Sequence, residues 1–301
     1  MSNDIKKIAC TFLACLLTFV FCSCNSSKIV TTPNHRLQWW LEEIGWDDNR
    51  TDISGKNIRI AVIDSGVDMK HRDIKDSIEK NIKVSQLDSS FIDDNSHGTG
   101  VIAVICGSCK NENGILGIAP DSKIISIDVT DSSDGTVEEE NLIEGITAAI
   151  NENVQIINIS MGIKNNSKEL YNVIKKAYTA GIIIIAAAGN YMESDILYPA
   201  AYPEVICVGS KNKSDEIMSP KSVSEKNIIY LPGEYISSAT TNNGYKSFSG
   251  TSISTPILTG IISLMLENNP DITQKDIYDY FSETSLNINV KDCINLKKEI
   301  L

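Results

Sequence analysis

Three side chains able to cooperate in nucleophilic catalysis stand at the borders of apolar stretches. Asp64 ends the run Ile-Ala-Val-Ile, His97 is followed by Gly-Thr-Gly, and Ser252 follows Ser-Gly-Thr and opens another apolar stretch. A serine hydroxyl becomes a nucleophile when an imidazole takes its proton and a carboxylate orients that imidazole. The residue types therefore match what acyl transfer requires.

Each motif on its own also has an ordinary structural interpretation. Many strands end in an aspartate, a single histidine is more often structural or exposed, and Ser252 could be a simple helix N-cap. The functional interpretation is that Asp64 points into the crevice at the carboxyl end of a parallel strand. His97 would then stand at the mouth of one helix. Ser252 would lie where another helix terminus favours a developing anion.

Together, Asp64, His97 and Ser252, in this chain order and with these neighbours, resemble the catalytic triad of the subtilisin-like serine proteases, the subtilases. The Asp, His, Ser order is a known property of that family. The resemblance extends from Leu37 to about Leu286. It implies a serine endopeptidase that hydrolyses peptide bonds through an acyl-enzyme. The alternative is a non-catalytic peptide-binding protein on a protease scaffold.

The same resemblance implies an oxyanion hole and a substrate cleft. Asn190 is similar to the family's oxyanion-hole asparagine, and would donate its side-chain amide beside the backbone N–H of Ser252. Residues 159–162 resemble the edge along which an extended peptide lies. Residues 186–189 resemble the walls of the pocket for the residue before the scissile bond. If Leu197 narrows that pocket, a small or medium apolar side chain is expected there. The expected substrate-binding residues are Ser160, Met161, Gly162, Ala187, Ala188 and Gly189.

The resemblance also implies a structural calcium ion, although no cofactor is expected for the chemistry. Asp73, nine residues after Asp64, matches the family's calcium-site aspartate, and the loop 110–117 resembles the loop that supplies the other ligands, with Asn111 at a side-chain position. Calcium takes six to eight oxygen ligands, which such residues can provide. The alternative is ordinary loop polarity.

The amino terminus has the layout of an export signal. Lys6 and Lys7 precede an apolar run from Ile8 to Phe21, and polar residues follow. Residues 21–24 resemble a bacterial lipoprotein signal ending at Cys24. Three outcomes stay open: a lipid anchor on Cys24, plain secretion, or a retained signal helix. In each case the chain is exported, as a cell-surface or membrane-anchored lipoprotein or as a secreted protein. Any contact with a membrane is expected only through that anchor or helix.

Alternating strands and helices are expected to position the site. Continuous Ile and Val runs predict strands covered on both faces. Residues 1–24 are the expected signal peptide, 25–36 a linker, and 37–301 one α/β domain, a three-layer subtilisin-like fold with a mostly parallel central sheet flanked by helices. The expected strands are Ile58–Ile63, Ile124–Val129, Gln155–Ile159, Ile182–Ala187 and Val205–Val208, and the expected helices are Gly98–Cys106, Glu138–Asn151, Ser167–Ala180 and Ser252–Asn268.

Composition excludes several other classes. The 301 residues are 42% hydrophobic, which is too apolar for a disordered chain. A net charge of −12 argues against nucleic-acid binding, so the expected partner of this monomer is a peptide or protein substrate. Eight cysteines do not make a disulfide scaffold in a chain of this length. The pair Cys106 and Cys109 admits a zinc site, a small-ring disulfide or two ordinary cysteines.

The short interval before the catalytic domain gives one expectation about the natural role. Only residues 25–36 separate the signal from the domain, whereas digestive family members usually carry a long inhibitory prodomain. A processing role on a specific precursor or leader peptide is therefore expected over general digestion.

Overall fold

The structure of the chain is a computed structural model. It describes residues 38–46, 53–84, 93, 96–109, 114–130, 136–192, 195–220, 228–284 and 288–296. The expected signal peptide and linker, and Leu37 and Asn111, lie outside the described residues.

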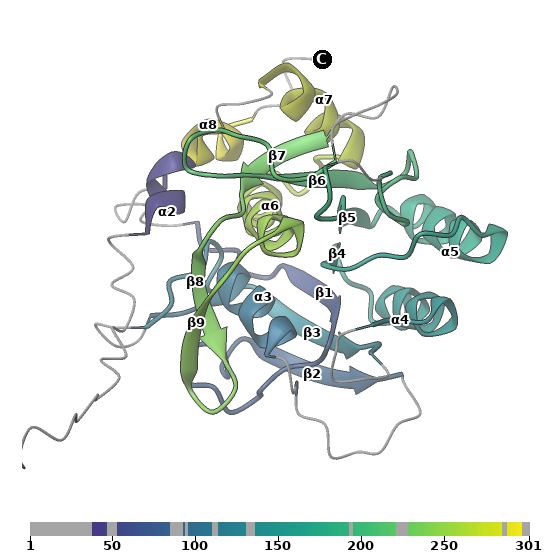
Figure 1. Cartoon of the computed structure of the whole chain (residues 1–301), viewed down its shortest axis with the longest axis horizontal. Coiled ribbons are helices and arrows are strands. Elements are labelled where there is room, and N and C mark those ends of the chain that lie inside the picture. The colour runs from purple at the N-terminus through teal and green to yellow at the C-terminus, as the bar shows by residue number, and fades with distance from the viewer. Residues whose placement is uncertain are drawn as a thin grey trace, which may run out of the picture. The chain divides into compact units, whose positions relative to one another are not determined.

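A seven-stranded parallel sheet is the centre of the described domain (Figure 1). Its spatial order is β2-β3-β1-β4-β5-β6-β7, so β1 lies inside the sheet between β3 and β4. Parallel strands need crossover connections, and among the described residues helices lie in those from β2 to β3, from β3 to β4 and from β4 to β5. The strands are β1 (Arg59–Asp64), β2 (Ile78–Lys83), β3 (Lys123–Asp128), β4 (Ile156–Ile159), β5 (Ile183–Ala187), β6 (Ile206–Lys211) and β7 (Ile228–Pro232).

Helices cover both faces of this sheet. Successive side chains of a strand point to opposite faces. Ile60 and Val62 of β1 accordingly pack in the core beneath α3 (His97–Cys106) and α6 (Thr251–Asn268). Ala61 and Ile63 pack in a second core beneath α4 (Glu139–Asn151) and α5 (Lys168–Thr179). The predicted three-layer α/β fold with a mostly parallel central sheet is confirmed.

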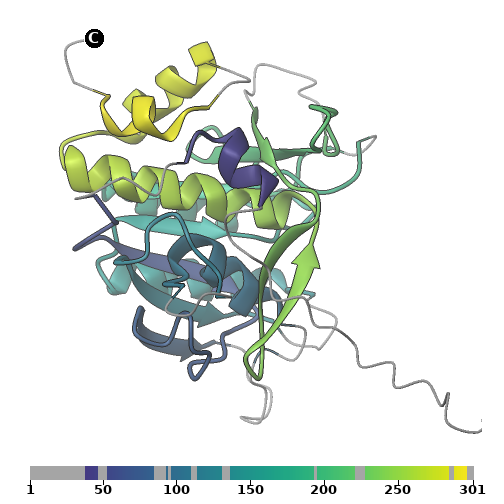
Figure 2. The ribbon, with the colours of Figure 1, turned by 90° about the vertical axis from the view of Figure 1, so that its left-hand side faces the viewer.

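Several elements were not expected from the sequence. An antiparallel hairpin, β8 (Ile236–Thr240) and β9 (Gly244–Phe248), lies against α3 (Figure 2). Strands β2 and β7 form the two edges of the sheet. The remaining helices are α2 (Trp39–Glu43), α7 (Gln274–Thr284) and α8 (Val290–Ile294).

The four cysteines among the described residues are thiols outside any disulfide, and three of them are buried. Cys106 donates its thiol to the carbonyl of Ile102, and burial raises its pKa to about 12. Cys109 is half-buried, with its Sγ 3.6 Å from the carbonyl oxygen of Gly114. Of the three interpretations of this pair, two ordinary cysteines fit.

No helix within the described ranges has both the length and the apolar content to cross a bilayer.

Candidate active site

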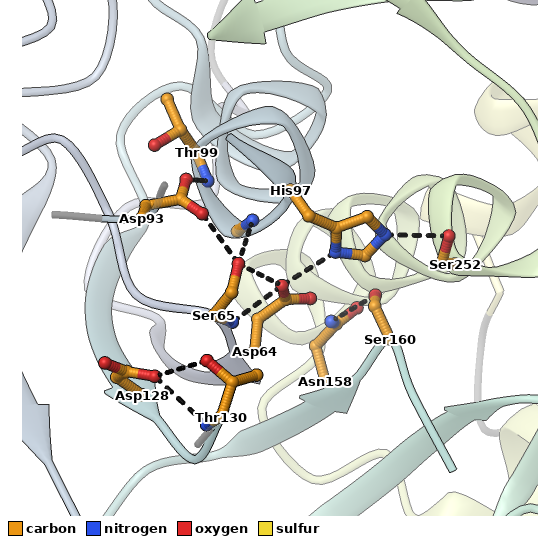
Figure 3. A network of polar contacts seen from close by, with 11 residues as sticks. Asp64, Ser65, Asp93, His97, Thr99, Asp128, Thr130, Asn158, Ser160 and Ser252 are labelled. Carbon is orange, nitrogen blue, oxygen red and sulfur yellow. Dashed lines mark hydrogen bonds and ion pairs between the residues drawn. The ribbon is translucent and has the colours of Figure 1, made fainter. Parts of the chain in front are cut away.

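Asp64, His97 and Ser252 form one hydrogen-bonded chain of side chains (Figure 3). His97 Nδ1 lies 2.7 Å from Asp64 Oδ1, and His97 Nε2 lies 2.9 Å from Ser252 Oγ. A carboxylate only accepts, so Nδ1 carries the proton and Nε2 is left to accept from the serine hydroxyl. The structure thus brings together the three residues that the separate motifs singled out.

The local structure explains why these side chains meet. Asp64 is the last residue of β1, His97 is the first of α3, and Ser252 lies in the first turn of α6. Gly98 allows the close approach of α3 to β1, because a Cβ on it would lie 2.1 Å from the carbonyl oxygen of Gly66 and 3.3 Å from Asp64 Oδ1. Any larger residue at 98 would push the imidazole away from the carboxylate.

Opposing effects act on the basicity of His97. Burial disfavours the imidazolium, but the negative charge of Asp64 and the hydrogen bond to it outweigh that effect. Asp93 also favours the charged form, whereas Lys246 opposes it. The net result is a pKa of His97 above its ordinary value.

A second buried carboxylate supports the first. Asp64 Oδ1 also accepts from the backbone N–H of Ser65 at 2.8 Å, and the Ser65 hydroxyl lies 2.6 Å from Asp93 Oδ1 (Figure 3). The other oxygen of Asp93 accepts from the N–H of Thr99 in the first turn of α3 at 2.7 Å. Asp93 therefore fixes the start of the helix that carries His97, and burial raises the pKa of Asp93.

Asp128 occupies the equivalent strand end next to Asp64. The two residues are partners in the register of β1 and β3. Asp128 accepts hydrogen bonds from the backbone N–H and the hydroxyl of Thr130, at 3.1 and 3.0 Å (Figure 3). Burial raises the pKa of Asp128. Its recorded contacts do not include His97.

Asn190 is held with its amide oxygen turned toward α6. Asn190 Oδ1 accepts from Thr251 N at 2.8 Å and from Thr251 Oγ1 at 3.0 Å. Gly250, with a φ of +122°, makes room, since a Cβ there would lie 2.7 Å from Asn190 Oδ1. With the oxygen occupied, the NH₂ group of Asn190 is the part left to donate. The role of Thr251 was not recognised from the sequence.

A cavity of about 570 Å³ adjoins the serine. Five of the expected substrate-binding residues line it, together with Asn190 and Ser252. Ala188 does not, because it is fully buried in the core beneath α4 and α5, whereas its neighbour Ala187 faces the cavity. Lining residues that the sequence did not suggest are Lys164, Tyr191, Ile196 and Thr251.

The edge at Ser160 is anchored by a buried amide. Asn158 donates to Ser160 Oγ at 2.9 Å and accepts from the hydroxyl of Thr259 on α6 at 2.8 Å. An asparagine inside the apolar strand Ile156–Ile159 is a signal that could have revealed this support, since buried amides need partners.

Asp73 has one oxygen satisfied and one orphaned. Oδ2 accepts from the N–H of Ile115 at 2.9 Å and from the Tyr245 hydroxyl at 2.8 Å. Oδ1 is buried without a hydrogen bond from the described residues, and a Cβ on Gly114 would lie 2.8 Å from it. Across those same residues no group of three potential metal-binding side chains occurs. An orphaned carboxylate oxygen against a loop fits a cation ligand.

Sequence comparison with known proteins identifies relatives of this chain. A sequence model of the Subtilase family matches residues 55–295. Subtilisin NAT of Bacillus subtilis subsp. natto is 35% identical over 236 residues, covering 77% of this chain and 61% of that protein. The minor extracellular protease Epr of Bacillus subtilis (strain 168) is 35% identical over 79% of this chain and 37% of its own. Subtilisin of Bacillus pumilus is 34% identical over 77% of this chain and 85% of its own. The chain thus spans less than two thirds of the first two relatives.

Proposed function

The chain belongs to the subtilase family, and from that premise we propose that it is a serine endopeptidase working through Asp64, His97 and Ser252. The hydrogen-bonded chain from Asp64 through His97 to Ser252, at 2.7 and 2.9 Å, is the observation that carries the proposal.

The proposed reaction uses one proton twice. Ser252 Oγ attacks the peptide carbonyl carbon while His97 Nε2 takes the hydroxyl proton. Asp64 stabilises the resulting imidazolium. Nε2 then returns the proton to the peptide nitrogen, the C–N bond breaks, and an acyl-enzyme remains on Ser252. Water repeats the two steps and releases the acid.

The negative oxygen of the tetrahedral intermediate would be stabilised by two donors. The NH₂ group of Asn190 is aimed by the contacts of its oxygen with Thr251. The backbone N–H of Ser252 lies in the first turn of α6, where amide groups have no partner within the helix. Donors fixed before the reaction cost no reorganisation during it.

Active-site labelling tests the proposal against the non-catalytic alternative. A fluorophosphonate reacts with an activated serine, so we expect one label per chain, on Ser252, followed by loss of peptide cleavage. A scaffold that only binds peptides would take up no label. The three proposed catalytic side chains are all present and in contact, which favours the enzyme.

We propose that the cavity beside Ser252 selects a small side chain before the scissile bond. The side chain of Leu197 lies between the two glycine walls: a Cβ on Gly162 would lie 2.8 Å from Leu197 Cβ, and a Cβ on Gly189 would lie 3.1 Å from Leu197 Cγ. Leu197 thus fills part of the cavity, and the charged residues Lys164 and Asp195 line it. Both features support selective processing of a precursor peptide over general digestion.

Replacing Leu197 with glycine is expected to admit large side chains. The ratio of kcat/KM for phenylalanine over alanine before the scissile bond should rise by about 10–100-fold, since a few methylene groups in a pocket are worth that much. Leu197→Ile, of nearly equal volume, is the matched control and should keep the original ratio. An unchanged ratio in Leu197→Gly would contradict the role of this residue.

We propose export through the signal-like segment, with residues 25–36 linking it to the catalytic domain. The name of the relative Epr calls that protein extracellular, which supports export. The mass of the first peptide of the exported chain distinguishes a lipid on Cys24 from plain cleavage and from a retained helix.

We propose that Asp73 and the loop that contains Asn111 hold a structural calcium ion. Adding EDTA should lower the Tm by about 5–10 °C, because removing a ligand bound at 100 times its Kd costs about 2.7 kcal/mol. Excess calcium should restore the Tm. In Asp73→Asn the Tm should be the same in calcium and in EDTA. Equal Tm values for the unaltered protein in both conditions would contradict the site.

A further inference from the structure

Strand β9 presents a cationic face beside His97. The Phe248 ring meets the His97 imidazole edge-on, with centroids 6.3 Å apart. Phe248 also packs against α3, because a Cβ on Gly100 would lie 2.5 Å from its ring. Lys246, two residues earlier, is on the same face of β9. Its Nζ lies 4.7 Å from the centroid of the Phe248 ring. The ring therefore holds an exposed ammonium group near the proposed base.

This face lies apart from the cavity that would hold the acyl side of a substrate. Neither Lys246, Phe248 nor His97 lines that cavity, whereas Ser252 does. In the proposed reaction the leaving nitrogen must take its proton from His97 Nε2, so the departing segment of the peptide passes over the imidazole. The residues that follow the scissile bond therefore come closest to Phe248 and Lys246.

The positive charge of Lys246 acts on the imidazole of His97. It lowers the pKa of His97 against the raising effect of Asp64 and Asp93. The whole chain carries a net charge of −12, which repels acidic peptides at long range. The positive charge of Lys246 would therefore offset this repulsion for one acidic side chain of the departing segment.

We propose that Lys246 selects an acidic side chain at the first or second residue after the scissile bond. The proposal rests on the proposed endopeptidase function and adds the substrate class on the leaving side. The Lys246 ammonium would pair with a substrate carboxylate while the Phe248 ring keeps the ammonium in place.

Internally quenched peptides that differ at one position test this selection. Each carries alanine before the scissile bond and glutamate, glutamine or lysine at the first or second position after it. For the unaltered protein, kcat/KM should be about fivefold higher for glutamate than for its isostere glutamine at one of the two positions, the size of an exposed charge pair. Because salt screens exposed charges, 1 M NaCl should bring that ratio close to one.

Charge variants assign the selection to Lys246. In Lys246→Gln the ratio of glutamate to glutamine should fall to about one, and in Lys246→Glu the lysine peptide should become the preferred substrate. Lys175→Glu makes the same charge change on an exposed position of α5, across the sheet, and should keep the original ratio.

The outcomes separate the inference from the function on which it rests. Cleavage with equal rates for glutamate and glutamine peptides would overturn the role of Lys246 while leaving the endopeptidase proposal intact. A preference for glutamate that persists in Lys246→Glu would do the same. Absence of both cleavage and fluorophosphonate labelling would overturn the proposed function, and this inference with it.

Discussion

Ser252→Ala is expected to lower kcat by about 10⁶-fold, the magnitude established for subtilisin itself. The variant has no oxygen at the position 2.9 Å from His97 Nε2, so no acyl-enzyme can form. Once the nucleophile is lost, His97 has no serine proton to accept and Asp64 has no imidazolium to stabilise, so only binding and the oxyanion donors remain.

This loss is expected without loss of the fold. Ser252 is half-buried, and the recorded contact of its hydroxyl is with His97, so the free energy of unfolding should change by less than about 1 kcal/mol. Ser249→Ala, three residues earlier, is the matched control: it removes a hydroxyl that accepts from the N–H of Tyr235 and should keep cleavage and labelling. Cleavage by Ser252→Ala at the original rate would overturn the assignment of the nucleophile.

The sequence was most informative where a strand is buried on both faces. Runs such as Ile182–Ala187 have no polar residue, and such composition is typical of strands inside a parallel sheet. The borders of these runs are then the strand ends. The amino-acid pattern alone therefore predicts that Asp64 lies at the carboxyl edge of the sheet.

The edge strand β2 and the hairpin strand β9 were missed for the opposite reason. Strand β2 has no buried position and carries three charged residues among its six, and the side chains of β9 are half-buried or exposed. A short polar strand has no distinct sequence pattern, because its pairing partner stabilises it more than its own composition does. The hairpin carries Phe248 and Lys246, so this side of the site could not be predicted.

The supporting contacts of the site depend on distances across the fold. Asp93 reaches Ser65 over 28 positions, and Thr251 reaches Asn190 over 61. No local pattern encodes such pairs. The error at Ala188 has a simpler origin, since alternation along an extended chain sends Ala187 and Ala188 to opposite sides. Predicting both on one wall ignored that alternation.

Asp64→Asn is expected to lower kcat/KM at neutral pH by about 10⁴-fold. Loss of the triad aspartate has an effect of about this size in a protease of another fold and in subtilisin. An amide has no charge with which to balance the imidazolium that forms in the transition state. The amide also has an NH₂ donor, which must replace one of the two carboxylate oxygens. If the nitrogen takes the place of Oδ1, it faces the N–H of Ser65 and turns His97 to the wrong tautomer.

The other orientation of the amide is costly as well. Oδ2 of Asp64 is buried and has no hydrogen-bond partner among the described residues, so an NH₂ group there would be an unsatisfied donor. Such a group costs about 1–3 kcal/mol. We therefore expect a lower Tm together with the loss of activity.

The pH dependence separates loss of charge from loss of structure. In the unaltered protein Asp64 raises the pKa of His97, so the acid limb of kcat/KM lies at higher pH than it would for a histidine without this carboxylate. In Asp64→Asn the raising effect disappears while burial continues to disfavour the imidazolium. The pKa of His97 must then fall, and the acid limb of the residual activity should move to lower pH. A variant that was only partly unfolded would lose amplitude without this shift.

Asp128→Asn is the matched control for the position of the charge. It makes the same change at the neighbouring strand end, on a carboxylate that is also buried and whose pKa burial raises. Asp128 is bonded to Thr130, so its variant should lose less than about tenfold in kcat/KM. If the Asp128 and Asp64 variants lost activity equally, the two carboxylates would act as a general negative field at the sheet edge. A difference of about three orders of magnitude would assign the effect to the hydrogen bond with His97, which Asp64 makes and Asp128 does not.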